Sequence, residues 1–263
     1  MPEALPSPDE TKRCPFCDEE IRVKAVICKH CHQWMPGYTY ESAIRDMVIQ
    51  KQVTELSAEE QRQAALGRDE QLKLALAWSA GNKIGSLRGF DLSARDLRGL
   101  NLAGADLRGA DLRETDLSGA NLTKANLTKA NLFRANLPQA ILRQAQLTDA
   151  YAREANMERA DLSGSRLLRA NLRGAILNNA KLHRVDMEQA NLKTVNLRGA
   201  SLRESYLKDT DLNSAKLEDA DFKGAMLVRT SFQNSDLYQY QIEDAAGITE
   251  VVLPDGKSYT RPE

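Results

Sequence analysis

The chain has 263 residues, 36 of them Lys or Arg and 37 Asp or Glu, so its formal net charge is −1. This balance argues against a general nucleic-acid or membrane-surface protein, whose affinity depends on excess positive charge. No stretch reaches the 18 consecutive apolar residues of a transmembrane helix, and the first residues lack the apolar run of a signal peptide, so we expect a cytoplasmic protein.

Residues 1–12 contain three Pro and are interpreted as a flexible leader. All four cysteines follow within residues 13–37, in the pattern C-x2-C-x10-C-x2-C: Cys14, Cys17, Cys28 and Cys31. Two such thiolate pairs suit one tetrahedral ion. Because a segment this short has almost no apolar core, bound metal would supply most of its folding free energy. We therefore predict a structural Zn2+ site.

Two other uses of these cysteines remain open, disulfides and redox chemistry, although the missing signal peptide disfavours disulfides. A catalytic zinc needs an open fourth position, which four Cys ligands do not leave. His30 and His32 are therefore expected to face solvent. Phe16 and Trp34 are interpreted as packing residues of the ribbon, or alternatively as an exposed partner-binding patch.

The same string also resembles the small bacterial zinc-ribbon family, whose pattern is CPxC…EI…A…CxxC. The resemblance extends from Cys14 to Cys31 and includes, besides the cysteines, Pro15, Glu20, Ile21 and Ala25. It implies a zinc ribbon over residues 13–37.

Residues 38–84 are predicted to be helical and to form a linker or an N-terminal cap. Ile44, Met47, Val48 and Ile49 recur at helical spacing, and Ser57 with Glu60 is typical of a capping box. A second helical stretch, after an interruption expected at Gly67, is closed by Gly81. We expect three of its residues to cover the first coil of the following domain: Leu72, Leu76 and Trp78. A helical dimerisation or partner surface is the alternative.

From Leu87 to Ile242 the sequence repeats every five residues. Leu occupies 26 of the 32 positions visited in steps of five, and a small residue stands two places before almost every one of them. A helix would spread a five-residue period around its axis, and a flat strand would alternate it between two faces. One-sided burial of Leu therefore requires a backbone that bends once in each repeat. Asp or Asn before Leu suits such bends.

Segments such as ADLRG, ANLTK and ANLRG resemble the pentapeptide-repeat family. This resemblance covers residues 85–242 and implies a mainly β fold, a right-handed quadrilateral β-helix with four repeats per coil. The 32 repeats would then make about eight coils, a rod roughly 38 Å long at strand spacing. Six departures at the bend position call single turns into question, but not the coil: Ile141, Tyr151, Arg166, Ile176, Lys181 and Met226.

Four repeats per coil would stack residues that are 20 apart, and two outward rows are then rich in cations. The first row includes Arg113, Phe133, Arg153, Arg173 and Lys193, and the second includes Arg143, His183 and Arg203. Stacked like charges repel, and we expect relief from the glutamates that directly follow, Glu114, Glu154 and Glu204. The rows are interpreted as a solvated mixed surface or, more sharply, as a shallow groove for an anionic partner.

The last part, residues 243–263, is predicted to be a hairpin cap and a tail. Phe222 and Phe232 replace Leu near the end of the rod, which suggests a widened coil. The sequence then alternates and turns at Pro254-Asp255-Gly256. Val251, Leu253 and Tyr259 are expected to cover the open end. A homodimer through the C-terminal coils is the alternative that the family resemblance suggests.

The leading functional hypothesis is a non-enzymatic scaffold that binds another protein, with the zinc ribbon as recognition head on a rigid rod. We find no convergent set of catalytic groups. A nucleic-acid-binding module is the first alternative. The resemblance also implies a second, because some family members mimic DNA and protect gyrase from quinolones. Residues 85–242 carry 23 basic and 19 acidic side chains, and this net positive charge disfavours DNA mimicry.

Overall fold

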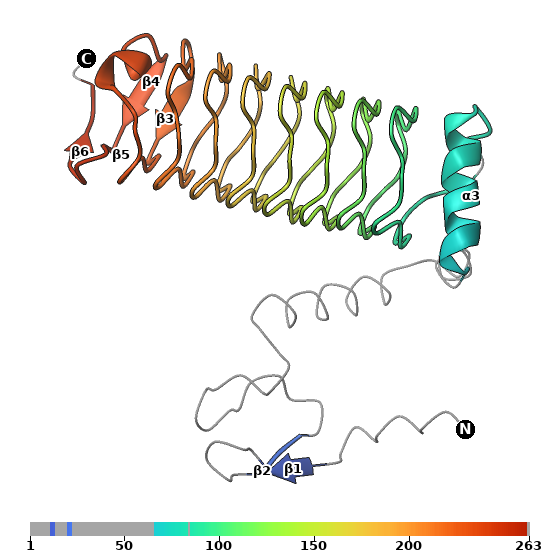
Figure 1. Ribbon diagram of the computed structural model, residues 1–263. Helices are drawn as coiled ribbons and strands as arrows, with labels where there is room; N and C mark the ends of the chain where they lie inside the picture. The colour runs from blue at the N-terminus through green and yellow to red at the C-terminus, as the bar shows by residue number, and fades with distance from the viewer. Residues whose placement is uncertain (1–10, 14–19, 23–65, 84, 262–263) are drawn as a thin grey trace. The chain divides into compact units, whose positions relative to one another are not determined.

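The computed structural model describes residues 11–13, 20–22, 66–83 and 85–261 (Figure 1). The chain divides into two compact units, Met1–Glu55 and Leu56–Glu263. In the first unit, strand β1 (Thr11–Arg13) pairs antiparallel with β2 (Glu20–Arg22), with Arg13 opposite Glu20. The residues of the predicted zinc site and of the predicted helical segment between 38 and 65 lie outside the described residues.

The second unit is a coil whose backbone returns to the same position after every four repeats. Isolated parallel bridges join each residue at the bend position to its equivalent one coil later, from Asp91 and Asp111 to Asp211 and Ser231. Each coil thus contains four five-residue repeats, as predicted for a β-helix. Figure 1 shows the coils stacked between helix α3 at one end and the strands β3 to β6 at the other.

Each repeat bends at the two residues that follow the buried Leu. The second of these residues is left-handed, whether it is glycine, as at Gly119 (φ 65°), or not, as at Glu114 (φ 56°). The Asp or Asn before Leu stabilises the bend, because its side-chain oxygen accepts a hydrogen bond from the nitrogen two residues later. In one example the Asn121 Oδ1 atom lies 3.0 Å from the Thr123 nitrogen.

The six departures at the bend position do not disturb the coil. All six residues form parallel bridges with the equivalent residue of the coil before. Five of their repeats keep the same turn, and Met226 instead begins strand β3 (Met226–Val228). The turns that the sequence called into question are therefore regular at the other five positions, and the coil is kept as expected. Ladder hydrogen bonds between coils hold the backbone there without the Asp or Asn side chain.

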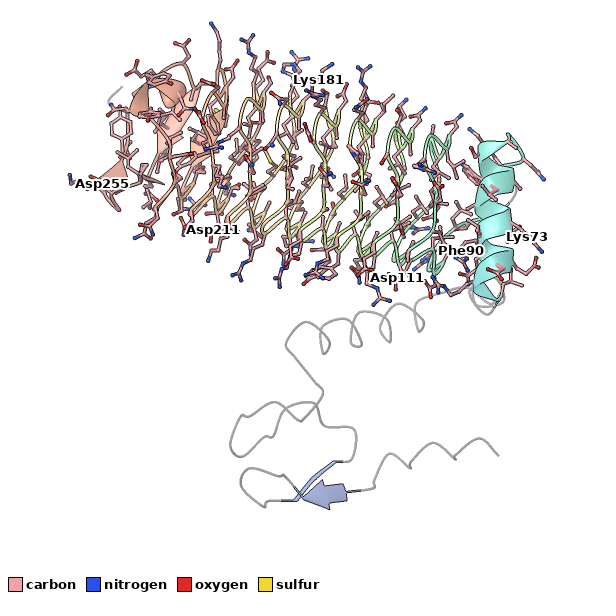
Figure 2. All side chains as sticks on the ribbon, in the orientation of Figure 1. Lys73, Phe90, Asp111, Lys181, Asp211 and Asp255 are labelled. Carbon is pink, nitrogen blue, oxygen red and sulfur yellow. The ribbon has the colours of Figure 1, made fainter. Side chains whose placement is uncertain are left out.

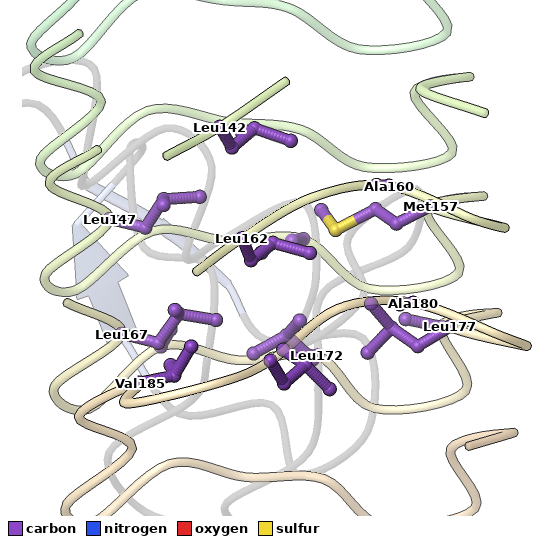
Figure 3. Packing of buried hydrophobic residues seen from close by; sticks show 14 of the residues in the cluster. Leu142, Leu147, Met157, Ala160, Leu162, Leu167, Leu172, Leu177, Ala180 and Val185 are labelled. Atoms are coloured by element: carbon purple, nitrogen blue, oxygen red, sulfur yellow. The ribbon is translucent and has the colours of Figure 1, made fainter. Parts of the chain in front are cut away.

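The interior of the coil is filled by the leucines and by the small residues two places earlier. Figure 3 shows them in adjacent layers, among them Leu142 and Leu162. The last coils instead contain Phe222 and Phe232, whose rings meet edge to face with centroids 5.7 Å apart. Buried threonines at the small position are satisfied: Thr115 Oγ1 donates to the Leu92 carbonyl at 2.8 Å.

Helix α3 (Arg68–Ser79) covers the first coil. Its N-cap is Gly67, and Gly81, with a φ of 99°, follows its C-terminal end, as predicted for a closing glycine. Gln71, Ala75 and Trp78 are buried and Leu72 packs against the core. Leu76, however, is 43% exposed, so its prediction as a covering residue was wrong. It lies well off the face that Gln71, Ala75 and Trp78 define.

Two polar side chains of α3 supply the hydrogen-bond acceptors that a preceding coil would otherwise supply to the first coil. Within the rod, nitrogens such as that of Asp111 donate to a carbonyl of the coil before, here Phe90 at 2.8 Å. In the first coil the Asp91 nitrogen donates to Gln71 Oε1 at 2.7 Å, and the Asn101 nitrogen donates to Ser79 Oγ at 2.9 Å. The helix thus satisfies main-chain groups that an uncovered coil end would leave unpaired.

At the C-terminal end the register changes by one residue. Strand β3 pairs in parallel with β4 (Gly247–Thr249), with Met226 opposite Gly247. The short 3-10 helix η1 (Gln239–Ile242) lies between them in the sequence, and Gln241 Nε2 donates to the Leu217 carbonyl at 2.6 Å.

The final hairpin is present as predicted. Strand β5 (Val251–Val252) pairs antiparallel with β6 (Ser258–Tyr259) around the predicted turn. Val251 is buried, and Leu253 and Tyr259 pack against the core.

Candidate interaction surface

The four-repeat register brings the residues of each predicted row together on successive coils. The first row is Arg113, Phe133, Arg153, Arg173 and Lys193, and the second row contains Arg143, His183 and Arg203. The two rows lie on different sides of the rod. Figure 2 shows Asp111 and Asp211, which flank the first row, along one edge, and Lys181, which flanks the second row, on the opposite edge.

Many cations of the rows are neutralised by carboxylates of the following coil. An Arg or Lys one place after Leu reaches the Asp that precedes the equivalent Leu of the next coil. Arg143 Nε lies 2.7 Å from Asp161 Oδ2, Lys193 Nζ lies 3.0 Å from Asp211 Oδ2, and Arg203 pairs with Asp221. These pairs compensate much of the charge that the sequence places in the two rows.

Of the three glutamates that directly follow arginines of the rows, Glu154 is the one that forms an ion pair with the arginine before it in the described structure. Arg153 Nη2 lies 3.2 Å from Glu154 Oε1. Glu204 instead pairs with Arg184 on the preceding coil, at 2.7 Å, and Arg113 pairs with Asp111. Side chains at equivalent places in successive coils project side by side at strand spacing, whereas adjacent residues of a turn diverge.

An aromatic and arginine cluster interrupts the first row on two neighbouring coils. The Phe133 and Tyr151 ring centroids are 6.2 Å apart, and the Arg134 guanidinium lies over the Phe133 ring at 4.8 Å. Glu154 joins this group because Arg134 Nε approaches its Oε2 at 2.8 Å. The hydrogen bond from Arg134 lowers the pKa of Glu154, against the opposing effect of burial, so the carboxylate stays ionised at neutral pH.

Sequence reasoning missed Arg134 and Tyr151, and it also missed the polar caps Gln71, Ser79 and Gln241. The signal for the ion pairs was in the sequence, as opposite charges placed about one coil apart. The sequence contains no such signal for the buried glutamines, because their role depends on where the ladder of main-chain hydrogen bonds between coils ends.

No metal site can be assembled from the described residues, in which no group of three His, Cys, Asp or Glu side chains is close enough to share an ion. The predicted ligands lie outside these residues, as do His30 and His32. In the described part of the chain, helices are too short or too polar to cross a lipid bilayer.

The five-residue period and the four-repeat coil allow this chain to be compared with known protein families. The family model described as "Pentapeptide repeats (8 copies)" matches residues 91–132, 130–167, 155–193, 165–206 and 205–239. Together these segments span 91–239, which is 149 of the 263 residues and more than half of the chain. The chain belongs to the pentapeptide-repeat family, and its coil is a right-handed β-helix.

Solved structures include similar coils. QnrB1, a plasmid-mediated fluoroquinolone resistance protein, is 18% identical, with 60% of this chain and 88% of that chain covered and a TM-score of 0.52. HetL from the cyanobacterium Nostoc sp. strain PCC 7120 is 26% identical over 70% of this chain and 96% of that chain, with a TM-score of 0.36. No curated protein sequence matches the chain. The likeness to QnrB1 shows a shared fold.

Proposed function

We propose that this protein is a non-enzymatic scaffold that binds another protein through the outer wall of its β-helix. On this proposal the rod has about eight coils and the N-terminal zinc ribbon is a separate recognition head. The observation that supports it most is the distribution of side chains in the described coils. Leucines and small residues fill the interior, so variation in sequence is confined to outward positions that a rigid ladder holds in rows.

The zinc ribbon is proposed from cysteine spacing, and the described strands are compatible with it. β1 and β2 pair antiparallel, and the segment that connects them in the sequence includes Cys14 and Cys17. A Cys-x2-Cys pair has the usual ligand spacing of structural zinc sites. The ribbon's Zn2+ would be held by Cys14, Cys17, Cys28 and Cys31.

The similarity to QnrB1 is one of fold, and we do not extend fluoroquinolone resistance to this chain. An imitation of DNA requires an acidic surface, and residues 85–242 carry four more basic than acidic side chains. Several of the carboxylates are also occupied by arginines, as in the pairs of Arg169 with Asp149 and Arg229 with Asp209.

Affinity capture from the native cell tests the scaffold. The full chain should retain a defined protein that the chain lacking residues 1–36 releases or binds more weakly, because the ribbon is the proposed head. Zinc analysis of the purified full chain should give one Zn2+ per chain. Capture of the same amount of nucleic acid by both chains, with no protein retained, would contradict the proposal.

A further inference from the structure

Arg173 differs from the other arginines of the two rows because, in the described structure, its side chain forms no ion pair. Arg113, Arg153, Arg143 and Arg203 each have a carboxylate partner. The cause is visible in the sequence. The residue 18 places later is Asn191, and the residue two places earlier is Asn171, whereas Asp occupies the corresponding positions at Asp161 and Asp111.

The pentapeptide around Arg173 occurs a second time with its charge compensated. Residues 171–175 and 196–200 both read NLRGA. In the second copy, Arg198 Nε lies 3.2 Å from Glu218 Oε2. The backbone turn is the same in both copies, with Gly174 at φ 70° and Gly199 at φ 63°. Glu218 stands 20 residues after Arg198, whereas Lys193 stands 20 residues after Arg173. Within the described coils, the uncompensated charge of Arg173 therefore depends on the next coil and not on its own pentapeptide.

The Arg173 side chain is exposed, with cations on both neighbouring coils and an aromatic pair nearby. Arg153 and Lys193 stand on the coils before and after it. Gly174 adds no side chain beside it, and a Cβ there would lie 3.6 Å from Glu154 Cγ and 3.8 Å from Thr194 Oγ1. Of the aromatic pair, Tyr151 lies on the coil before Arg173 and Phe133 lies one coil further away. An anionic group can reach the guanidinium while an apolar neighbour contacts the rings.

We propose that Arg173 anchors a docking site for an acidic segment of the partner protein, an inference that rests on the scaffold function proposed above. A partner carboxylate receives two parallel N–H donors from the planar guanidinium. Arg153 and Lys193 on either side are already paired with Glu154 and Asp211, so the partner's carboxylate is directed to Arg173. The Phe133 and Tyr151 rings receive an apolar side chain of the same segment.

Charge and ring geometry favour a short acidic peptide over a nucleic acid. The Phe133 and Tyr151 rings are tilted by 33° with centroids 6.2 Å apart, and the Arg134 guanidinium lies over Phe133 at 4.8 Å, so the two rings do not form a stacked platform for successive bases. Asp111, Glu154 and Asp211 lie on the same side of the rod as the first row. These carboxylates repel a long polyphosphate chain but leave room for one or two carboxylates at Arg173.

The test is a titration of the full chain with an eight-residue peptide that contains one Asp, one Glu and one Leu among Ser and Gly, followed by the arginine Nε–Hε resonances in NMR spectra. The Arg173 resonance should shift and saturate, and a peptide with Asn and Gln in place of the acids should leave it unchanged. Arg173→Gln should weaken peptide binding by about tenfold, the loss of one charged hydrogen-bonded contact. Arg198→Gln, in the identical pentapeptide, should not weaken it.

An unmoved Arg173 resonance, or equal losses in the two variants, would overturn the docking site. A single-stranded DNA oligonucleotide that binds at Arg173 more tightly than the peptide would also overturn it. The scaffold proposal fails separately. If the Arg173→Gln chain captures the same cellular protein as the unmodified chain, the docking site is wrong and the scaffold stands. If the peptide binds at Arg173 but no protein is captured, the site stands as an acidic-peptide site and the scaffold fails.

Discussion

The Gln71 side chain and the Asp91 main chain form a hydrogen bond that closes the first coil, with Oε1 and the nitrogen 2.7 Å apart. Gln71 is buried, and its Nε2 atom donates to the Leu66 carbonyl at 3.0 Å. At the other end, the buried Gln241 side chain donates to the Leu217 and Ala220 carbonyls. Both ends of the ladder are thus satisfied by a glutamine amide, with opposite polarity: an acceptor at the N-terminal end and a donor at the C-terminal end.

The first prediction concerns this cap. Gln71→Leu keeps most of the side-chain volume but leaves the Asp91 nitrogen without its partner, so the free energy of unfolding should fall by about 1–3 kcal/mol. Urea denaturation of the rod, followed by circular dichroism, measures it. Leu76→Ala on the same helix is the control, because Leu76 is 43% exposed and its loss should change stability by less than about 0.5 kcal/mol. A larger loss of unfolding free energy for Leu76→Ala than for Gln71→Leu would show that α3 does not cap the coil through Gln71.

The second prediction compares substitutions of two adjacent leucines, one in the interior of the coil and one on its outer surface. Leu167 is fully buried, whereas Leu168 is partly exposed on the outside of the same repeat. Leu167→Ala removes packed methyl groups from a rigid stack and should lower the free energy of unfolding by about 2–5 kcal/mol. Leu168→Ala should change it by about 0.5 kcal/mol or less. Similar losses in thermal or urea denaturation would contradict the inward orientation of the repeat leucines.

The five-residue period and the buried leucines were predictable from the sequence because one backbone geometry repeats along the rod. An inserted or deleted residue would displace every later coil. The residue at the bend position mattered less than expected, since ladder hydrogen bonds hold the turns at Ile141 and Tyr151 without an Asp or Asn side chain. The partner of each charge was harder to predict. Glu204 has cations on its own coil and on the preceding one, and only the geometry of the turn shows that Arg184 is the nearer.

The ends were the least predictable part of the rod. Helical periodicity selected Leu72, Leu76 and Trp78 as covering residues, but the face that packs on the first coil also contains a buried amide, Gln71. A pattern of apolar residues cannot reveal that a main-chain nitrogen needs an acceptor. The candidate site was likewise only partly predictable. The sequence predicted the two rows of cations, but the ion pairs in the structure were needed to distinguish Arg173 from the other arginines.

The third prediction concerns the left-handed residue of each turn. Gly104 has a φ of 71° and open space where a Cβ would be, whereas a Cβ on Gly199 would lie 2.5 Å from Asn179 Oδ1. Gly104→Ala should lower the free energy of unfolding by about 1 kcal/mol, the cost of a left-handed L-residue. Gly199→Ala should lower it further, because the Asn179 side chain must move. In an Asn179→Ala background the two glycine substitutions should have the same effect. A difference that persists there would place the additional strain elsewhere.

The fourth prediction concerns acid stability and the pair of Asp96 and Arg98. The hydrogen bond from the Arg98 side chain lowers the pKa of Asp96 to about 2, from an ordinary value of 3.8. A carboxyl group whose pKa is lower in the folded than in the unfolded chain stabilises the fold above the unfolded value and loses that contribution as the pH falls. Thermal stability should therefore be level from pH 7 to about 5 and should decline between about pH 4 and 2.

The Asp96 carboxyl carbon, followed by NMR as the pH is lowered, checks the assignment to this pair. In the unmodified chain its titration should be centred near the depressed pKa of about 2. Arg98→Gln should move the pKa of Asp96 upward towards its ordinary value, because the charged donor is lost. Arg159→Gln is the matched control, since Arg159 is also exposed, lies on a later coil of the same side and approaches only Glu158 among the described carboxylates, at 3.9 Å. A pKa of Asp96 that stays low in the Arg98 variant would assign the shift to the turn backbone instead of the ion pair.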